Sequence, residues 1–163
     1  MTISKEEYFE RTLANIEEHG WQFTFVFDPD GKDPDFAYTV GFPKSLNAPE
    51  LIVCGLPRDL MSHMLWEMHR KLEKGEPIYD GARWPDLLEG FDCITKRAAR
   101  ADLYEDWVLS SVWHWEHCGN SGSPEVFQIV WPGARDGLFP WQDGCDQSVI
   151  DAQPALWLAD TNR

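Results

Sequence analysis

The run ELIVCGL, residues 50–56, constrains the fold of this 163-residue chain more than any other feature. From Leu51 to Cys54 it carries no charged or amide side chain, and Ile52 and Val53 are β-branched. Half-exposed strands alternate apolar and polar residues, whereas a short unbroken apolar run suits a strand that is covered on both faces. We therefore expect residues 50–56 to form the centre of a sheet.

The hydrophobic period of the chain changes at Gly20. Before it, the segment SKEE at 4–7 matches a capping box, which predicts a helix that ends at this glycine. Over 21–27, aromatic residues occupy every second position, which predicts a strand with one aromatic face. The polar turn DPDGKDPD at 28–35 predicts a hairpin that leads into a second strand at 36–41.

The rest of the chain alternates between the two periods. Its predicted elements are a loop at 43–49, a helix from 58 to a stop at Gly75, a loop at 76–90, a weaker strand at 91–95, a helix at 101–117, a strand at 126–131, and an apolar patch at 155–158 that folds back over the core. No repeat or linker divides the chain. We therefore expect one globular domain over 1–163, of the α+β class, in which a mostly antiparallel sheet of about five strands is covered by two or three helices.

The acidic charge balance narrows the choice of partners. The chain has 28 acidic and 14 basic residues, for a formal net charge of −14. A field of this sign repels phosphate backbones and anionic bilayers, so we expect neither a nucleic acid nor a membrane partner. It is compatible with a basic protein, a metal or a cationic small molecule, although acidity also serves solubility alone.

The amino terminus has no basic segment followed by an apolar one, and no stretch reaches the ~18 apolar residues of a membrane span. We therefore expect the protein in the cytoplasm. The four cysteines contain no CxxC pair, which favours reduced thiols. They are Cys54, Cys93, Cys118 and Cys145.

Nine Trp and nine Phe residues are more than one small core comfortably buries. Some of them should line a groove or an interface, where Trp is favoured. An exposed Trp patch would serve as a ligand pocket or as the contact face of a homodimer.

The strand FAYTVGF at 36–42 carries two adjacent hydroxyls, which is unusual in a core strand. Because side chains alternate between faces, Tyr38 should face the core, and its phenol then needs a buried partner. Glu50, at the start of the next strand, is the candidate acceptor. Such a pair would simply fix the register of the sheet, or it would belong to a binding site.

In the binding alternative, Tyr38, Thr39 and Glu50 form the polar end of an aromatic pocket, and Gly41 lets a ligand approach the backbone. Gln128 would add an amide and Trp131 a stacking wall. No cofactor is indicated by any signature in the sequence.

A metal site is a further possibility. His114, His117 and Cys118 share one face if their helix continues, and Cys145 or Asp146 would complete a tetrahedral set. The spacing is generic, because it matches no named zinc motif and histidine is also favoured at a helix carboxyl end.

Four segments carry a resemblance to a known family. They are GW at 20–21, FAYTVGF at 36–42, PELIVCGL at 49–56 and QIVWP at 128–132. Together they resemble the bacterial family of the domain of unknown function 4262, over about residues 19–153. The pairing of YTVGF with PELIVCGL is the most specific part, although the family usually has leucine where Phe42 stands. The resemblance implies a single compact intracellular domain and no particular reaction.

Three hypotheses for the function follow. The first is a binding domain whose aromatic pocket, near the YTVGF and PEL strands, takes up a small molecule or a peptide segment. The second is an acidic interaction protein, such as an immunity factor or inhibitor, that meets a basic partner. The third is a metal-dependent enzyme that uses His114, His117 and Cys118, although the sequence has no GxSxG, HExxH or phosphate-binding-loop signature.

Overall fold

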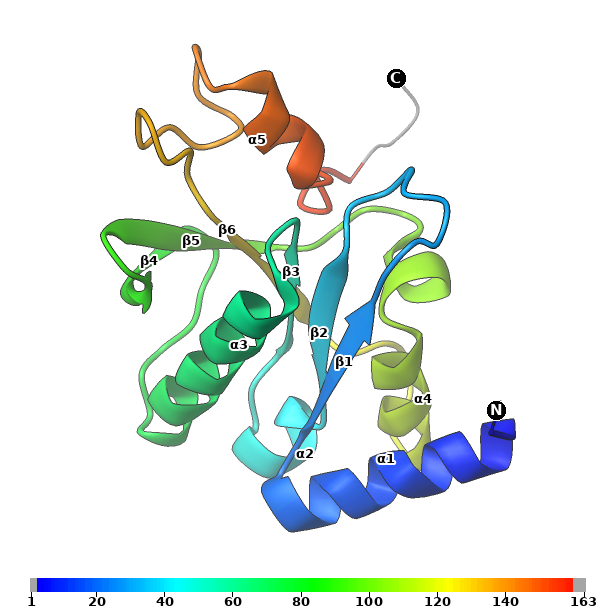
Figure 1. The fold of residues 1–163 in the computed structure, drawn as a ribbon. Helices are drawn as coiled ribbons and strands as arrows, with labels where there is room; N and C mark the ends of the chain where they lie inside the picture. The colour runs from blue at the N-terminus through cyan, green and yellow to red at the C-terminus, as the bar shows by residue number, and fades with distance from the viewer. Residues whose placement is uncertain (1–2, 160–163) are drawn as a thin grey trace.

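The computed structural model describes residues 3–159, in which one six-stranded sheet is flanked by helices (Figure 1). The strand order is β1-β2-β3-β6-β5-β4. In chain order the elements are α1 (Lys5–His19), β1 (Gln22–Val26), β2 (Phe36–Val40), α2 (Phe42–Leu46), β3 (Glu50–Cys54), α3 (Arg58–Glu73), β4 (Ala82–Leu88), β5 (Phe91–Arg97), the π-helical turn η1 (Leu103–Trp107), α4 (Leu109–His117), β6 (Val126–Val130) and α5 (Gln147–Ala152). The predicted α+β class is confirmed.

The apolar run forms the centre of the sheet, as predicted. β3 lies between β2 and β6, and every residue of these three strands is buried. It pairs with β2 in the antiparallel direction and with β6 in the parallel direction. A strand with neighbours on both edges and side chains buried on both faces has no position for a polar side chain without a partner.

Helices cover both faces of the central strands. On one face lies α3, which crosses in front of the sheet in Figure 1 and buries the stripe Met61, Met64, Leu65 and Met68 against Ala37, Leu51, Val53, Phe127 and Ile129. On the other face, the segment from η1 to α4 and the carboxyl-terminal tail cover Phe36, Tyr38, Val40 and Ile52 with Leu103, Val108 and Leu156. The alternate residues of each central strand therefore belong to two separate cores.

The helix α1 begins and ends as predicted. The Ser4 hydroxyl accepts a hydrogen bond from the Glu7 amide at 3.1 Å, and the Glu7 carboxylate accepts one from the Ser4 amide at 3.3 Å. Gly20 ends the helix with a φ of +87°, which favours glycine. Within residues 3–159, no helix is long and apolar enough to cross a membrane.

The sheet differs from the prediction in strand number and direction. It has six strands, because the predicted loop at 76–90 contains β4, and it is mixed, because β3 and β6 are parallel. β4 carries Pro85 and a register shift between Trp84 and Leu88. Proline and irregular pairing are tolerated on an edge strand but interrupt its alternating pattern, so the strand was missed.

Two further predicted segments differ from the observed secondary structure. The helix expected at 101–117 is interrupted at Val108, whose φ of −109° and ψ of 51° separate η1 from α4. The loop expected at 43–49 contains most of the short helix α2. The apolar patch at 155–158 folds back as predicted, since Leu156 is fully buried in the second core.

A glycine at the end of β3 fixes the approach of α5. Gly55 has a φ of +81°, and a Cβ atom there would lie 2.3 Å from the carbonyl oxygen of Ala152. Gly55→Ala is therefore expected to lower the free energy of unfolding by about 2 kcal/mol, measured by urea denaturation. Gly75→Ala is the control, since Gly75 has a similar φ of +91° but nothing within 4 Å. Equal losses in both variants would contradict the close contact.

Candidate functional site

The carboxylate of Glu50 organises the turn that follows β2. It is 1% exposed and accepts hydrogen bonds from the Thr39 hydroxyl at 2.7 Å, the Gly41 amide at 2.8 Å and the Phe42 amide at 3.2 Å. Gly41 has a φ of +113°, which turns the chain from β2 into α2. The carboxylate therefore satisfies the first backbone donors of α2, in the manner of a helix cap supplied from a neighbouring strand.

The predicted pair between Tyr38 and Glu50 is wrong, because Thr39 supplies the hydroxyl. The Tyr38 oxygen instead accepts a hydrogen bond from the Ser110 amide at 3.1 Å. The pairing of β2 with β3 ends at Tyr38 and Ile52, and beyond it the Leu51 amide donates to the Thr39 hydroxyl at 2.9 Å. The end of the ladder thus brings Thr39 to the carboxylate.

Gln128 and Trp131 make contacts elsewhere. The Gln128 amide donates to the Pro154 carbonyl at 2.9 Å and accepts from the Leu156 amide at 3.1 Å. The Trp131 indole donates to the Cys54 carbonyl at 2.8 Å. These side chains hold the carboxyl-terminal tail and the end of β3, and no hydrogen bond connects them to the Thr39 and Glu50 pair.

Burial raises the pKa of Glu50 to about 7, against the opposing effect of its three hydrogen bonds. The carboxyl group borders a small hollow that Lys44, His114 and Cys118 also line. The volume of this hollow is about 10 Å³, close to the space that one water molecule needs. A larger ligand therefore has no room at Glu50 in this conformation.

Two of the three metal-ligand candidates contact each other, and the third packs elsewhere. His114 is buried, with its Nε2 atom 3.5 Å from the Cys118 sulfur, whereas the His117 ring stacks on Trp113 at a centroid distance of 5.0 Å. The Cys145 thiol donates to the Leu138 carbonyl. Throughout residues 3–159, no group of three or more His, Cys, Asp or Glu residues is placed to hold a metal ion. The metal hypothesis remains a prediction without a preformed site in that part of the chain.

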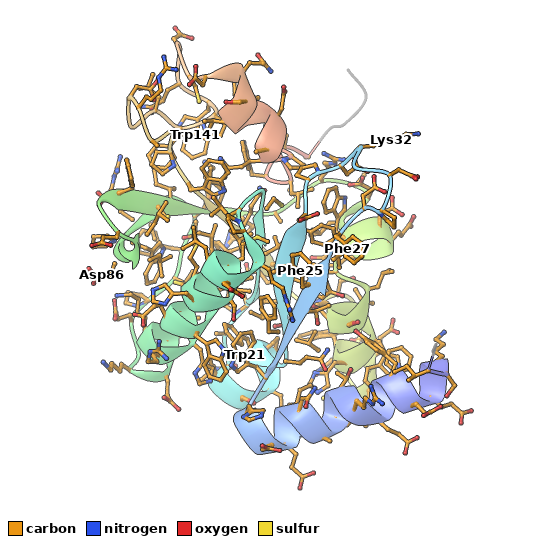
Figure 2. The ribbon with its side chains drawn as sticks, viewed as in Figure 1. Trp21, Phe25, Phe27, Lys32, Asp86 and Trp141 are labelled. Carbon is orange, nitrogen blue, oxygen red and sulfur yellow. The ribbon has the colours of Figure 1, made fainter. Side chains whose placement is uncertain are left out.

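A larger pocket of about 380 Å³ lies at the other end of β2, between the β1–β2 hairpin and η1. Figure 2 shows Phe25 and Phe27 following one another along β1 toward the hairpin loop that carries Lys32. The lining residues are Val26, Phe27, Asp28, Asp33, Pro34, Phe36, Arg100, Asp102, Asp106 and Trp107. We call this cavity the hairpin pocket.

Aromatic rings form the walls of the hairpin pocket. Phe36 and Trp107 lie at a centroid distance of 4.8 Å, with their planes tilted by 53°. Phe27, which also lines the pocket, is 60% exposed. The Trp107 indole donates to Asp102 at 3.3 Å, so this ring has a fixed orientation. Trp107 ends a π-helical turn, a conformation that is frequent at functional sites.

The hairpin pocket carries an excess of negative charge. Arg100 pairs with Asp102 through two hydrogen bonds of 2.9 and 3.0 Å, which lower the pKa of that carboxyl group. Asp28 accepts hydrogen bonds from three backbone amides of its own loop, those of residues 30, 33 and 32, and its pKa is also lowered. Four aspartates and one arginine line the pocket, so its lining residues have a formal excess of three negative charges.

The sequence predicts an aromatic pocket at Tyr38, Thr39 and Glu50, none of which lines the hairpin pocket. The sequence predicts only a turn at 28–35 and a helix at 101–117, the segment that contains Trp107. The available signal was the acidic turn at 28–35 between two phenylalanines, Phe27 and Phe36. Its partners at 100–107 are far away in the sequence, so no local pattern connects them.

By its fold and this pocket, the chain is a small α+β domain with an acidic, aromatic cavity at one end of a mixed sheet. The family model described as "Domain of unknown function (DUF4262)" matches residues 15–146, and the chain belongs to this family. No curated protein and no solved structure matches the chain.

Proposed function

We propose that this domain binds a small organic cation in the hairpin pocket. The observation that supports the proposal is the combination, in one cavity of about 380 Å³, of the Phe27, Phe36 and Trp107 rings with an excess of aspartate. This volume is in the range of small-molecule sites. Aromatic faces attract cations through the ring quadrupole, and carboxylates add a direct Coulomb attraction.

The pocket already holds one cation of the protein itself. The guanidinium carbon of Arg100 lies 5.6 Å from the centroid of the Trp107 ring, while its nitrogens bind Asp102. A ligand would meet the aspartates that Arg100 does not neutralise, namely Asp28, Asp33 and Asp106. The net charge of −14 would add long-range steering of a cation toward the protein.

The acidic interaction protein is the alternative function. The same acidic pocket favours it, because a lysine or arginine side chain of a basic partner is also an organic cation. Such a partner would use the same pocket together with the surrounding acidic surface. Binding of Nα-acetyl-arginine amide at least tenfold tighter than that of simple alkylammonium ions would favour this alternative. No corresponding site supports the metal-dependent enzyme among residues 3–159.

Isothermal titration with a matched ligand pair tests the proposal. Choline and 3,3-dimethylbutan-1-ol have nearly the same shape and differ in charge. We expect choline to bind with a Kd of about 1 mM or tighter, and the neutral alcohol about tenfold more weakly, since cation–π attraction contributes about 1–2 kcal/mol in a partly desolvated site.

Trp107→Ala should weaken choline binding about tenfold. The control is Trp141→Ala, which changes a tryptophan that is 42% exposed and lies outside the pocket. Equal affinity for both ligands would contradict the proposal.

A further inference from the structure

β1 is an edge strand of the sheet, and it lacks the features that usually protect an edge (Figure 1). Its register with β2 is continuous, and Gln22–Val26 contains neither proline nor a charged side chain. The opposite edge strand, β4, carries Arg83, Pro85 and Asp86 and has a register shift. Proline, charge and irregular pairing keep a sheet edge from pairing with another chain. The β1 edge is therefore suited to accept a further strand.

The register of the sheet shows which backbone groups of β1 point outward. The Asp35 carbonyl accepts a hydrogen bond of 2.8 Å from the amide that follows β3, so the backbone of Asp35 points toward β3. Because successive residues of an antiparallel strand bond to opposite neighbours, the backbone of Tyr38, three residues later, points toward β1. Its register partner Thr24 therefore points toward β2, and Phe23 and Phe25 on either side point away from the sheet.

The outward backbone groups of Phe23 and Phe25 are without partners in the described chain. Outside the ladder between β1 and β2, no hydrogen bond among residues 3–159 involves the backbone of either residue. In an antiparallel ladder, each residue that faces a neighbouring strand exchanges two hydrogen bonds with it. The edge thus offers four backbone hydrogen bonds to an extended segment.

A groove of about 290 Å³ lies beside this edge, between β1 and α1. We call it the edge groove. Its lining residues are Ile3, Tyr8, Arg11, Asn15, Gln22, Phe23, Thr24 and Phe25. A peptide that joins a sheet edge obtains affinity from the backbone of the strand and specificity from side chains beside it. The edge groove supplies both, because α1 places its side chains next to the open edge.

The charge at the edge groove is opposite to that of the protein as a whole. Arg11 is exposed and is the one charged residue among the described residues that line the groove. On the other face of β1, the guanidinium carbon of Arg58 lies 5.9 and 5.5 Å from the ring centroids of Phe23 and Phe25. Within residues 3–159, neither arginine forms a salt bridge, whereas four other arginines do. An acidic side chain on an added strand would therefore meet a cation on either face.

We propose that the β1 edge binds an extended, acidic peptide segment of another protein, which joins the sheet as a further strand. The backbone of the segment bonds to Phe23 and Phe25, and its carboxylates pair with Arg11 or Arg58. The negative field of the rest of the protein is screened beyond about 8 Å at physiological ionic strength. The edge groove shares no lining residue with the hairpin pocket, so the proposal does not depend on cation binding there.

The experiment follows amide hydrogen exchange by NMR while a probe peptide is added at about 150 mM salt. The probe is the acetylated and amidated heptapeptide TVEVEVT. The charge control is TVKVKVT, and the backbone control is TVEPEVT, because proline lacks an N–H group and interrupts a strand. We expect the probe at about 1 mM to slow the exchange of the Phe23 and Phe25 amides at least tenfold, and both controls to bind at least tenfold more weakly.

Arg11→Gln combined with Arg58→Gln should weaken binding of the probe about tenfold. The matched control is Arg83→Gln, which removes an exposed arginine from the opposite edge of the sheet and should leave binding unchanged. Unchanged exchange at Phe23 and Phe25, or equal binding of the acidic and lysine peptides, would overturn the proposal. Slower exchange of these amides at higher protein concentration without peptide would also overturn it, because a second copy of the chain would then occupy the edge.

Discussion

Glu50→Ala is expected to lower the free energy of unfolding by about 4 kcal/mol. The substitution removes the acceptor of the Thr39 hydroxyl and of the Gly41 and Phe42 amides, all of which are buried. A buried donor without an acceptor costs about 1–3 kcal/mol, and the missing side chain also leaves a cavity. Chemical denaturation monitored by tryptophan fluorescence measures the loss.

The control is Glu73→Ala, which removes an exposed carboxylate near the end of α3. We expect its effect to lie within about 0.5 kcal/mol, as is usual for surface substitutions. Thr39→Val gives an intermediate case, because it removes one donor to Glu50 and the acceptor of the Leu51 amide but leaves the Gly41 and Phe42 amides bound to Glu50. A Glu50→Ala protein as stable as the Glu73→Ala protein would show that the turn between β2 and α2 does not depend on this carboxylate.

The contribution of Glu50 to stability should also fall as the pH rises from about 4.5 to about 7. The pKa of Glu50 is about 7 in the folded protein and near the ordinary value of 4.5 in the unfolded chain. Between these values the folded state keeps a proton that the unfolded state releases, so the unfolded state is favoured as the pH increases. At 1.36 kcal/mol per pH unit, the difference of about 2.5 units corresponds to a loss of about 3 kcal/mol.

The comparison with Glu50→Gln isolates this effect. Glutamine does not titrate, so the contribution of Glu50 disappears while other carboxylates keep theirs. We expect the wild-type protein to lose up to about 3 kcal/mol more than Glu50→Gln over this range. Denaturation curves at pH 4.5, 5.5, 6.5 and 7.5 give the two profiles. Parallel profiles would mean that Glu50 has the same pKa in both states.

The two ends of β2 have different roles. At the carboxyl end, the Thr39 hydroxyl and the Gly41 amide of the YTVGF motif form hydrogen bonds within the protein. These bonds explain why a polar residue stands in a core strand. At the amino end, Phe36 reaches the hairpin pocket. The motif that stands out in the sequence therefore builds the framework, and the adjacent acidic hairpin builds the pocket.

Local signals were sufficient for much of the fold. The cap residues of α1, the unbroken apolar run of β3 and the stripe of α3 each act over one or two turns or one strand, so the sequence reveals them directly. β4 was missed because Pro85 interrupts its alternation. The parallel direction of β6 was missed because a long connection separates it from β3, and local patterns do not encode which distant strands pair.

The candidate site was harder to predict than the fold. Thr39 and Tyr38 are neighbours, and their roles were exchanged because the pairing with β3 stops between them. The alternation itself holds, since Phe36, Tyr38 and Val40 share one core, and only the partner of Glu50 differs from the prediction. The hairpin pocket joins the segment at 26–36 to the segment at 100–107, and only the folded chain brings Arg100 and Trp107 to the acidic turn.

The most direct test of cation binding follows the indole N–H signal of Trp107 by ¹H–¹⁵N NMR during a choline titration. The signal is assigned from its absence in Trp107→Phe. We predict that the Trp107 signal shifts in a saturable manner while that of Trp141 stays in place, and that 3,3-dimethylbutan-1-ol at the same concentrations produces a much smaller shift. A Trp107 signal that does not move at choline concentrations up to about 20 mM, well above the expected Kd, would contradict the account.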